Sequence, residues 1–415
     1  MAEKADITRS PSPYHGWVVT FAGTGINLAL GVLYTWSMFK AAIEKDFGWA
    51  GAKLNDPYAL CCLVFAFAMI LAGRCQDRFG PRLTASIGGL LVAVGMILIS
   101  RTNDYAVWVF GFGVLVGTGI GFGYSSATPP ALKWFPPSKT GLIAGLVVAG
   151  FGLAPVYLAP TSQKLLGAYG LQTSMLIFGI AFLVIVCGLA QLLVNPPAGY
   201  VVASKSGAAK AAAASSTPSQ MLRTPSFWLL WVLYFIGAGA GLMVISSISP
   251  MAKKSMGDAA FIAVAVMAIG NAAGRIGAGL LSDRIGRRWT LMIVLLCQAI
   301  LMFIAIPVTG SQNTVGVVIV LIATFIGFNY GANLSLFPSF TKDLWGLKSF
   351  GVNYGFLFTA WGVGGFVFSR VQQTLLAGSK SYSTSFILAG LLLIAGAAMT
   401  FLIKPPQPKL VAVPA

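Results

Sequence analysis

The stretch GRCQDRFGPR (residues 73–82) recurs as GLLSDRIGRR (residues 279–288). Matching positions lie 206 residues apart throughout, and each stretch follows a long apolar run. A weaker echo, GLIAG at residues 141–145 and GVNYG at residues 351–355, has an offset of 210. The chain therefore reads as two repeated halves, with a charged, glycine-bounded loop at the same place in each.

Twelve apolar runs surround these motifs, and each is long enough to cross roughly 30 Å of hydrocarbon as a helix. A membrane barrel is excluded because its strands are about ten residues long and alternate in polarity. The runs cover residues 16–39, 55–73, 83–100, 105–128, 139–160, 172–194, 226–248, 258–281, 289–308, 314–337, 350–370 and 383–403.

The repeat and the runs together predict an all-α membrane protein with twelve transmembrane helices in two six-helix halves. The first half covers residues 1–194 and the second covers residues 223–415. Residues 195–222 are rich in Ala, Ser and Pro, which is typical of a flexible linker.

Composition excludes most other classes. Of the 415 residues, 57% are hydrophobic and 9% are charged, against about 25% charged in soluble chains. This excludes a soluble enzyme, a disordered chain and a secreted disulfide scaffold. With a single His, the sequence has no His-based metal cluster, and no cofactor motif stands in the context it requires. A membrane enzyme is disfavoured because no nucleophile–base pair is visible.

Basic residues are unequally divided between alternate loops. Seventeen of the 27 Lys and Arg residues fall on the side of both termini and the linker, nine fall on the other side, and Arg275 lies inside a run. Cytoplasmic loops are enriched in Lys and Arg, so both termini are expected in the cytoplasm, with the chain in the inner membrane. Because the charges sit in short loops between spans, the net charge of +17 does not indicate nucleic-acid binding.

The G-x-x-x-D-R-x-G-x-R stretches resemble the loops after spans 2 and 8 of the major facilitator superfamily. WFPPSKTGLIAGL (134–146), LFPS (336–339) and NYGF (353–356) resemble monocarboxylate transporters, including bacterial homologues, and the oxalate/formate antiporter family. The resemblance covers the chain apart from its termini and middle loop. It implies the major facilitator fold, transport of small carboxylates and a monomer that works alone.

Arg275 is the strongest single signal for a substrate site. It lies about 12 Å along its helix from the nearest loop charge, Asp283, and all ten acidic residues lie in loops or at span ends. A buried cation costs several kcal/mol unless it is paired, which favours a bound anion, and a carboxylate suits the guanidinium fork. The alternative is a structural arginine bonded to backbone carbonyls or a tyrosine. Its offset-206 counterpart is Met69, so the fold does not require a charge there.

Further candidate ligands lie near Arg275. Asn271, one turn away on the same face, either binds the substrate or bonds to another helix. By resemblance, several aromatic positions match the lining of an oxalate site, with helix packing as the alternative. These positions are Tyr34, Tyr124, Phe151 and Tyr330, with Leu334 matching a further aromatic position and Trp361 standing where the oxalate antiporter has a Lys.

A single cation favours a monocarboxylate, such as lactate, pyruvate, formate or acetate, since each unpaired charge is costly in a dry site. Monocarboxylate transporters carry Asp where this chain has Asn271. Substrate transport could therefore be coupled in three ways. A proton could travel with the carboxylate, His15 or Asp56 could carry a proton at a span end, or one anion could exchange for another. Proton symport is the favoured route.

Asp77–Arg78 and Asp283–Arg284, at the cytoplasmic ends of spans 2 and 8, are predicted gate elements. Their acids and bases can pair across the halves when the transporter faces outward and exchange partners as the inner side opens. The alternative, anchoring by positive charge, explains the arginines but not the aspartates. Two other transport classes compete. A drug–proton antiporter usually has an acidic residue inside the membrane, and this chain has none there. An anion channel would not need a two-half repeat with gate loops.

Overall fold

The computed structural model describes residues 13–197, 200, 216–245, 260–310, 316–379 and 381–403, which are helical except for short connections. Most of the predicted linker and the basic residues of both termini lie outside these ranges. The first-half elements are α1 (Pro13–Leu30), η1 (Gly31–Thr35), α2 (Trp36–Phe47), η2 (Gly51–Leu54), α3 (Asp56–Phe79), α4 (Pro81–Ile99), α5 (Tyr105–Trp108), the π-helical η3 (Val109–Val116), α6 (Gly117–Lys133), η4 (Pro137–Lys139) and α7 (Thr140–Ala190). The second-half elements are α8 (Pro218–Leu222), α9 (Pro225–Ile245), α11 (Ala260–Ile285), α12 (Arg287–Gly310), α13 (Gly316–Trp345), α14 (Phe350–Ser379), α15 (Ser383–Met399) and η6 (Thr400–Leu402).

The described helices account for the twelve predicted spans. Ten segments are long and apolar enough to cross a membrane. One of them, Pro137–Ala190, contains two spans, because α7 turns at Gly170, whose positive φ of 72° suits a glycine. The thirty-residue α14 is the remaining one, and no strand occurs among the described residues.

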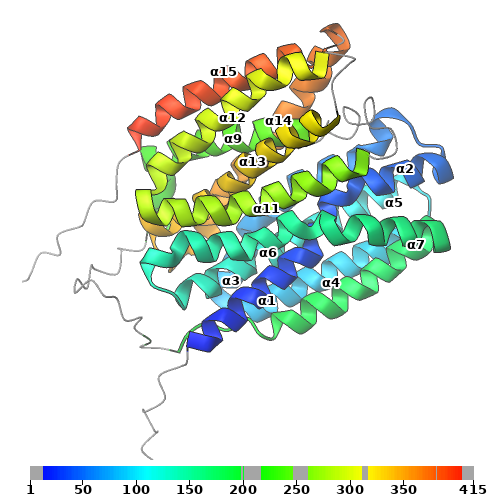
Figure 1. The fold of residues 1–415 in the computed structure, drawn as a ribbon. Coiled ribbons are helices and arrows are strands. Elements are labelled where there is room, and N and C mark those ends of the chain that lie inside the picture. Colours follow the sequence, from blue (N-terminus) through cyan, green and yellow to red (C-terminus); the bar gives the residue numbers. More distant parts are fainter. Residues whose placement is uncertain are drawn as a thin grey trace, which may run out of the picture.

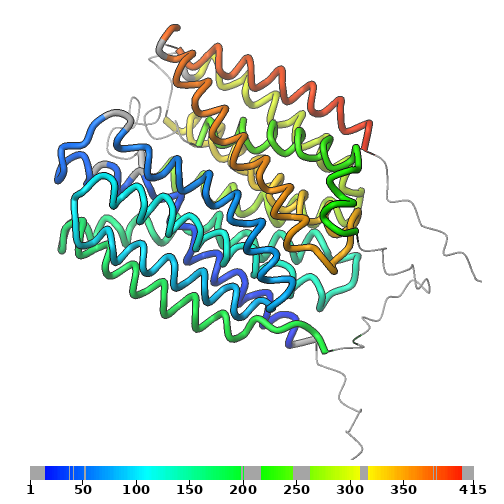
Figure 2. The backbone as a smooth tube through the Cα atoms, turned by 180° about the vertical axis from the view of Figure 1, so that it is seen from behind, coloured from blue at the N-terminus to red at the C-terminus, as the bar shows by residue number. Residues whose placement is uncertain are grey.

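The two halves lie side by side with their helices running in similar directions. Figure 1 shows α1, α3, α4, α6 and α7 on one side of the molecule and α9, α12, α13, α14 and α15 on the other, with α11 between. Figure 2 shows the same division from behind. The ends of α6 and α13 and the start of α14 meet residues beside or within the linker. Trp134 donates to the Val194 carbonyl, the Ser216 N–H donates to the Trp345 carbonyl, and Asn353 donates to the Ser216 carbonyl. We call this side the linker face.

The interface between the halves is built from two equivalent helix crossings. Gly73 of α3 contacts the backbone of Gly351 in α14, and Gly279 of α11 contacts that of Gly141 in α7. These glycine pairs are related by the offsets of the sequence repeat. Because a Cβ atom at any of the four would overlap facing backbone, glycine permits the close approach. The motifs that predicted the repeat therefore seal the halves near the linker face.

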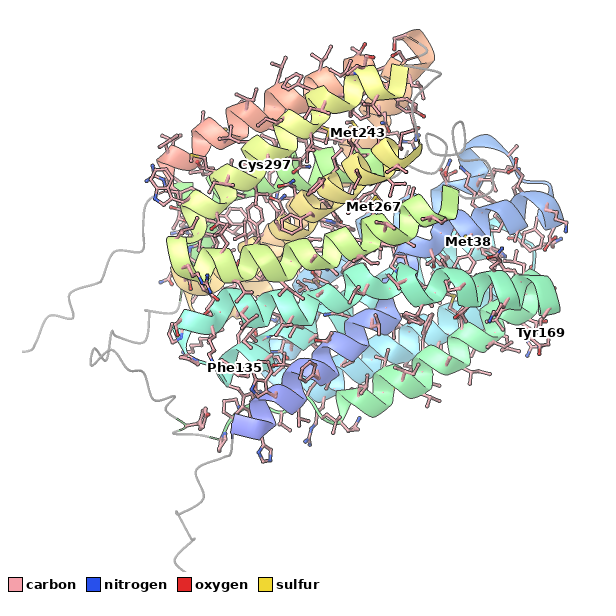
Figure 3. The ribbon with its side chains drawn as sticks, in the orientation of Figure 1. Met38, Phe135, Tyr169, Met243, Met267 and Cys297 are labelled. Carbon is pink, nitrogen blue, oxygen red and sulfur yellow. The ribbon has the colours of Figure 1, made fainter. Side chains whose placement is uncertain are left out.

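The outer surface of the bundle is apolar. Leu71 is 66% exposed and Tyr169 is 60% exposed, and Figure 3 shows side chains projecting outward along the whole bundle. Such a surface can face lipid because the backbone N–H and C=O groups of each helix are already hydrogen-bonded within the helix. The interior, by contrast, holds a fully buried Arg275 and many buried aromatic rings. The chemistry therefore lies in the interior.

Candidate functional site

Arg275 lies in the middle of α11 with none of its surface exposed. Its Nε donates to Asn271 Oδ1 at 3.0 Å, and Nη1 donates to the Val148 carbonyl of α7 in the other half. Nη2 has no hydrogen-bond partner among the described residues. No acidic residue pairs with Arg275 among the described residues, and the bond to the Val148 carbonyl is the kind of contact that the alternative of a structural arginine includes.

The α7–α11 crossing sets the position of this guanidinium. Gly145 lies against the backbone of Arg275, and a Cβ atom at Gly152 would stand 3.2 Å from Arg275 Nε and 3.3 Å from Asn271 Oδ1. The small residues of α7 thus leave room for the long side chain. At the equivalent α3–α14 crossing, Gly355 lies against the backbone of Met69. One crossing is apolar and the other is cationic.

A chain of polar contacts joins three of the predicted aromatic residues. Trp361 Nε1 donates to the Tyr330 hydroxyl at 2.9 Å, and the Tyr330 and Tyr34 hydroxyls are 2.7 Å apart. Three N–H or O–H groups make only two hydrogen bonds in this chain, so one phenol proton remains for a further acceptor. The charge of Arg275 acts on both tyrosine hydroxyls, and the guanidinium also lies within hydrogen-bonding range of the Tyr34 hydroxyl. Donors therefore face the region of Arg275 from α13 and η1.

Aromatic rings pack beside this chain. Phe151 meets the rings of Tyr34 at 5.1 Å and Tyr124 at 5.5 Å, both edge to face. Phe65 lies 5.3 Å from Trp361 and 5.5 Å from Tyr124. The rings exclude water, which strengthens the remaining electrostatic interactions.

Two members of this aromatic wall were missed from sequence. Phe65 and Phe358 have ring centroids 5.1 Å apart, and Phe358 stacks on Trp361 at 5.0 Å. The repeat offers a signal for both, because Phe65 is the counterpart of Asn271 and Phe358 the counterpart of Val148. Leu334, one turn beyond Tyr330, is buried in the hydrophobic core.

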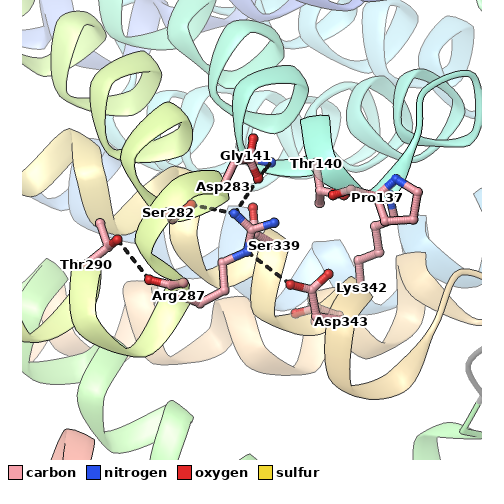
Figure 4. Close-up of polar contacts among 12 residues, drawn as sticks. Pro137, Thr140, Gly141, Ser282, Asp283, Arg287, Thr290, Ser339, Lys342 and Asp343 are labelled. Carbon is pink, nitrogen blue, oxygen red and sulfur yellow. Dashed lines mark hydrogen bonds and ion pairs between the residues drawn. The ribbon is translucent and has the colours of Figure 1, made fainter. Parts of the chain in front are cut away.

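One predicted gate element, Asp283–Arg284, lies at the linker-face end of α11 (Figure 4). Asp283 accepts the backbone N–H groups of Gly141 and Leu142, each at 2.9 Å, at the start of α7. Arg287 bridges Asp283 at 2.6 Å and Asp343 at 3.0 Å. A carboxylate at a helix N-terminus satisfies free N–H groups and the helix dipole.

The other predicted gate element, Asp77–Arg78, repeats the aspartate contact at the linker-face end of α3. Asp77 accepts the N–H groups of Gly351 and Val352 at the start of α14, each at 3.1 Å. Neither Arg78 nor Arg284 forms an ion pair among the described residues, whose ion pairs are those of Arg287. Arg78 lies over the Phe79 ring instead. Helix N-termini of the opposite half replace the basic partners.

Comparisons with known proteins agree with this architecture. The pattern that defines the Major Facilitator Superfamily matches residues 18–369. The chain belongs to this superfamily. It is 30% identical to the "Uncharacterized MFS-type transporter YhjX" of Escherichia coli over 86% of this chain and 87% of that one. Members of the Major Facilitator Superfamily are transporters, not enzymes.

Two further similarities are more distant. The oxalate:formate antiporter of Oxalobacter formigenes is 27% identical, covering 90% of this chain and 88% of the antiporter. Monocarboxylate transporter 13 of Rattus norvegicus is 23% identical, covering 94% and 89%. The FucP transporter in its outward conformation superposes with a TM-score of 0.68 at 15% identity, covering 94% of this chain and 99% of that one, which establishes the fold alone.

Proposed function

We propose that this transporter carries small monocarboxylates, of the lactate and pyruvate type, by alternating access. The observation that carries the proposal is the fully buried Arg275 guanidinium with an unpartnered Nη2. A carboxylate would accept from Nη2 and compete with the Val148 carbonyl for Nη1. Such an arrangement supplies two charge-assisted hydrogen bonds in a medium of low dielectric constant.

The rest of the site supports one negative charge rather than two. Trp361, at the position where the oxalate antiporter has a Lys, gives a neutral N–H group that is already bonded to Tyr330. The remaining phenol proton of the Tyr34–Tyr330 pair would reach a second substrate oxygen, such as a hydroxyl or keto group. A dicarboxylate would leave one charge unpaired beside buried rings, which is costly.

Relatives support the substrate class. The names of the oxalate:formate antiporter and of the monocarboxylate transporters state carboxylates as their substrates. Drug export is disfavoured because a cationic drug would be repelled by Arg275. The excess of basic residues on the linker face supports placing this face in the cytoplasm of a cell with an inner membrane.

Proton symport is the proposed mode of coupling, and anion exchange is the alternative. His15 and Asp56 lie in the first turns of α1 and α3, where His15 stacks against Trp134 and Asp56 accepts from the Tyr105 hydroxyl at 2.7 Å. Binding of the anion neutralises Arg275 and frees the loaded carrier to reorient. The two aspartate-capped helix starts, at α7 and α14, would then separate and open the linker face.

Purified protein in liposomes tests the proposal. Labelled L-lactate and pyruvate are followed with and without an inward proton gradient, and with or without preloaded formate or oxalate. We expect saturable uptake driven by the proton gradient and its loss in Arg275→Met, with the exposed Arg370→Met as the matched control. Uptake that requires a preloaded anion would establish exchange, and transport of neither acid would refute the substrate class.

A further inference from the structure

Three buried tyrosine hydroxyls lie close together, from three different helices. Tyr124 of α6, Tyr234 of α9 and Tyr354 of α14 are almost completely buried. None of their hydroxyl oxygens has a hydrogen-bond partner among the described residues. The hydroxyls of Tyr124 and Tyr234 each interact with that of Tyr354. We call these three residues the tyrosine triad.

The ring of one phenylalanine, Phe358, contacts all three tyrosine rings of the triad. Phe358 has ring centroids 5.4 Å from Tyr124, 5.7 Å from Tyr354 and 6.1 Å from Tyr234. The surrounding rings supply no acceptor, so the acceptors near the three O–H groups are one another's phenol oxygens. Buried donors with incomplete hydrogen bonds are costly, and phenylalanine would remove that cost at each position. Their presence indicates a ligand that accepts hydrogen bonds.

The sequence repeat explains how one of these hydroxyls became free. Tyr124 is the counterpart of Tyr330, and Phe151 is the counterpart of Trp361. Trp361 donates to Tyr330, whereas Phe151 only packs against Tyr124 edge to face. The first half thus keeps the phenol and lacks its partner. The Tyr124 hydroxyl therefore has no indole donor and faces the Tyr354 hydroxyl instead.

The triad lies on the linker-face side of the Arg275 site. Tyr354 precedes Trp361 by seven residues of α14, which is about 10 Å along the helix axis. It lies one turn from Gly351, whose N–H is held by Asp77. The charge of Arg275 acts on Tyr124 and Tyr234. A negatively charged group leaving Arg275 toward the linker face would therefore meet the triad before it passes the seal.

We propose that the triad is a second, transient carboxylate site, which receives the substrate carboxylate as it leaves Arg275 toward the linker face. This inference rests on the proposed function. Phenol O–H groups make short, charge-assisted hydrogen bonds to a carboxylate. Because the donors are neutral, they hold the anion less tightly than the guanidinium does. Weak sites in series let a bound ion move on.

Transport measured separately from each face tests the inference. Uptake of labelled L-lactate and pyruvate is compared in right-side-out and inside-out vesicles carrying the wild type, Tyr234→Phe, Tyr354→Phe or the double variant. Tyr157→Phe is the matched control, because its hydroxyl donates to the Leu28 carbonyl at 3.0 Å. We expect KM from the linker face to rise about tenfold, or 1.4 kcal/mol, in the double variant, with KM from the opposite face unchanged.

Other results would overturn the inference. Equal changes in KM from both faces would place the hydroxyls in the Arg275 site, and unchanged values would leave them a packing role. Loss of proton-driven uptake with intact lactate exchange would make them a proton path.

Failure of the proposed function is recognised separately. If the wild type moves neither acid, the Tm is measured with and without acetate. Acetate stabilisation that is lost in the double variant supports a carboxylate site at the triad, whereas equal stabilisation of both proteins refutes it.

Discussion

Replacing Arg275 by methionine separates a substrate ligand from a structural arginine. Methionine is the residue at the counterpart position, Met69, where it packs in an equivalent helix crossing. The variant removes the donors to Asn271 and Val148 and the unpartnered Nη2. It keeps a long apolar side chain, so that α7 and α11 can still pack.

The magnitudes follow from these contacts. A carboxylate taking two charge-assisted bonds would lose about 3–6 kcal/mol of binding, since each contributes about 1.5–3 kcal/mol. At 1.4 kcal/mol per decade, the Kd rises about 100- to 10,000-fold. Without an anion, the variant leaves the Asn271 amide short of a donor, at about 1–3 kcal/mol, but removes a buried charge that costs several kcal/mol. The Tm of the anion-free protein should therefore stay level or rise.

Two assays run together check this prediction. Labelled-acid binding to detergent-purified protein measures the Kd, and a thermal melt without carboxylates measures the Tm. The double variant Asn271→Phe with Arg275→Met reproduces the Phe65–Met69 pair and should melt at least as high as the single variant. A Tm several degrees lower, combined with preserved binding, would show that Arg275 only holds the helices together and would refute the reasoning.

Three further predictions address specificity, gating and packing. Trp361→Lys supplies a second cation, so oxalate should compete with lactate uptake about tenfold more strongly than in the wild type, measured by inhibition curves. Asp77→Asn should accelerate amide hydrogen exchange at the start of α14, and Asp283→Asn should do so at the start of α7. Each increase should be about tenfold for a cap worth 1.4 kcal/mol, as followed by mass spectrometry. Exchange rates equal to those of the wild type would exclude capping. Gly145→Ala should lower the Tm and transport because its Cβ meets the Arg275 backbone, whereas Gly188→Ala, whose Cβ meets nothing within 4 Å, should raise the Tm slightly.

The architecture could be predicted because it depends on features of short sequence segments. Apolar runs of span length, separated by short charged loops, leave few alternatives in a bilayer. The repeated stretches at residues 73–82 and 279–288 also mark real contacts, because their first glycines, Gly73 and Gly279, make the two helix crossings. The pairing of each glycine with a particular partner in the other half depends on tertiary structure. It became visible only when the halves were placed together.

The candidate site was predicted by residue type more than by partner. A lone Arg in an apolar run is a strong signal, but the Val148 carbonyl that accepts from it has no signature in sequence. Tyr34 and Tyr330 are 296 residues apart, and their hydrogen bond required the fold. The gate aspartates carried a charge signal, yet their acceptor role toward backbone N–H groups of the opposite half could not be read from side-chain charge.

The two crossings show how a symmetric scaffold can serve an asymmetric task. Both halves carry the same seal, an aspartate on the first turn of a facing helix, and such caps are worth about 0.5–2 kcal/mol each. In the alternating-access mechanism that we propose, seals of that strength would close the linker face and still exchange with water at modest cost. The Arg275 guanidinium appears in only one crossing, so a single bound anion would change the charge of one side alone. Under that proposal, the difference between Met69 and Arg275 would link substrate binding to the movement of one half against the other.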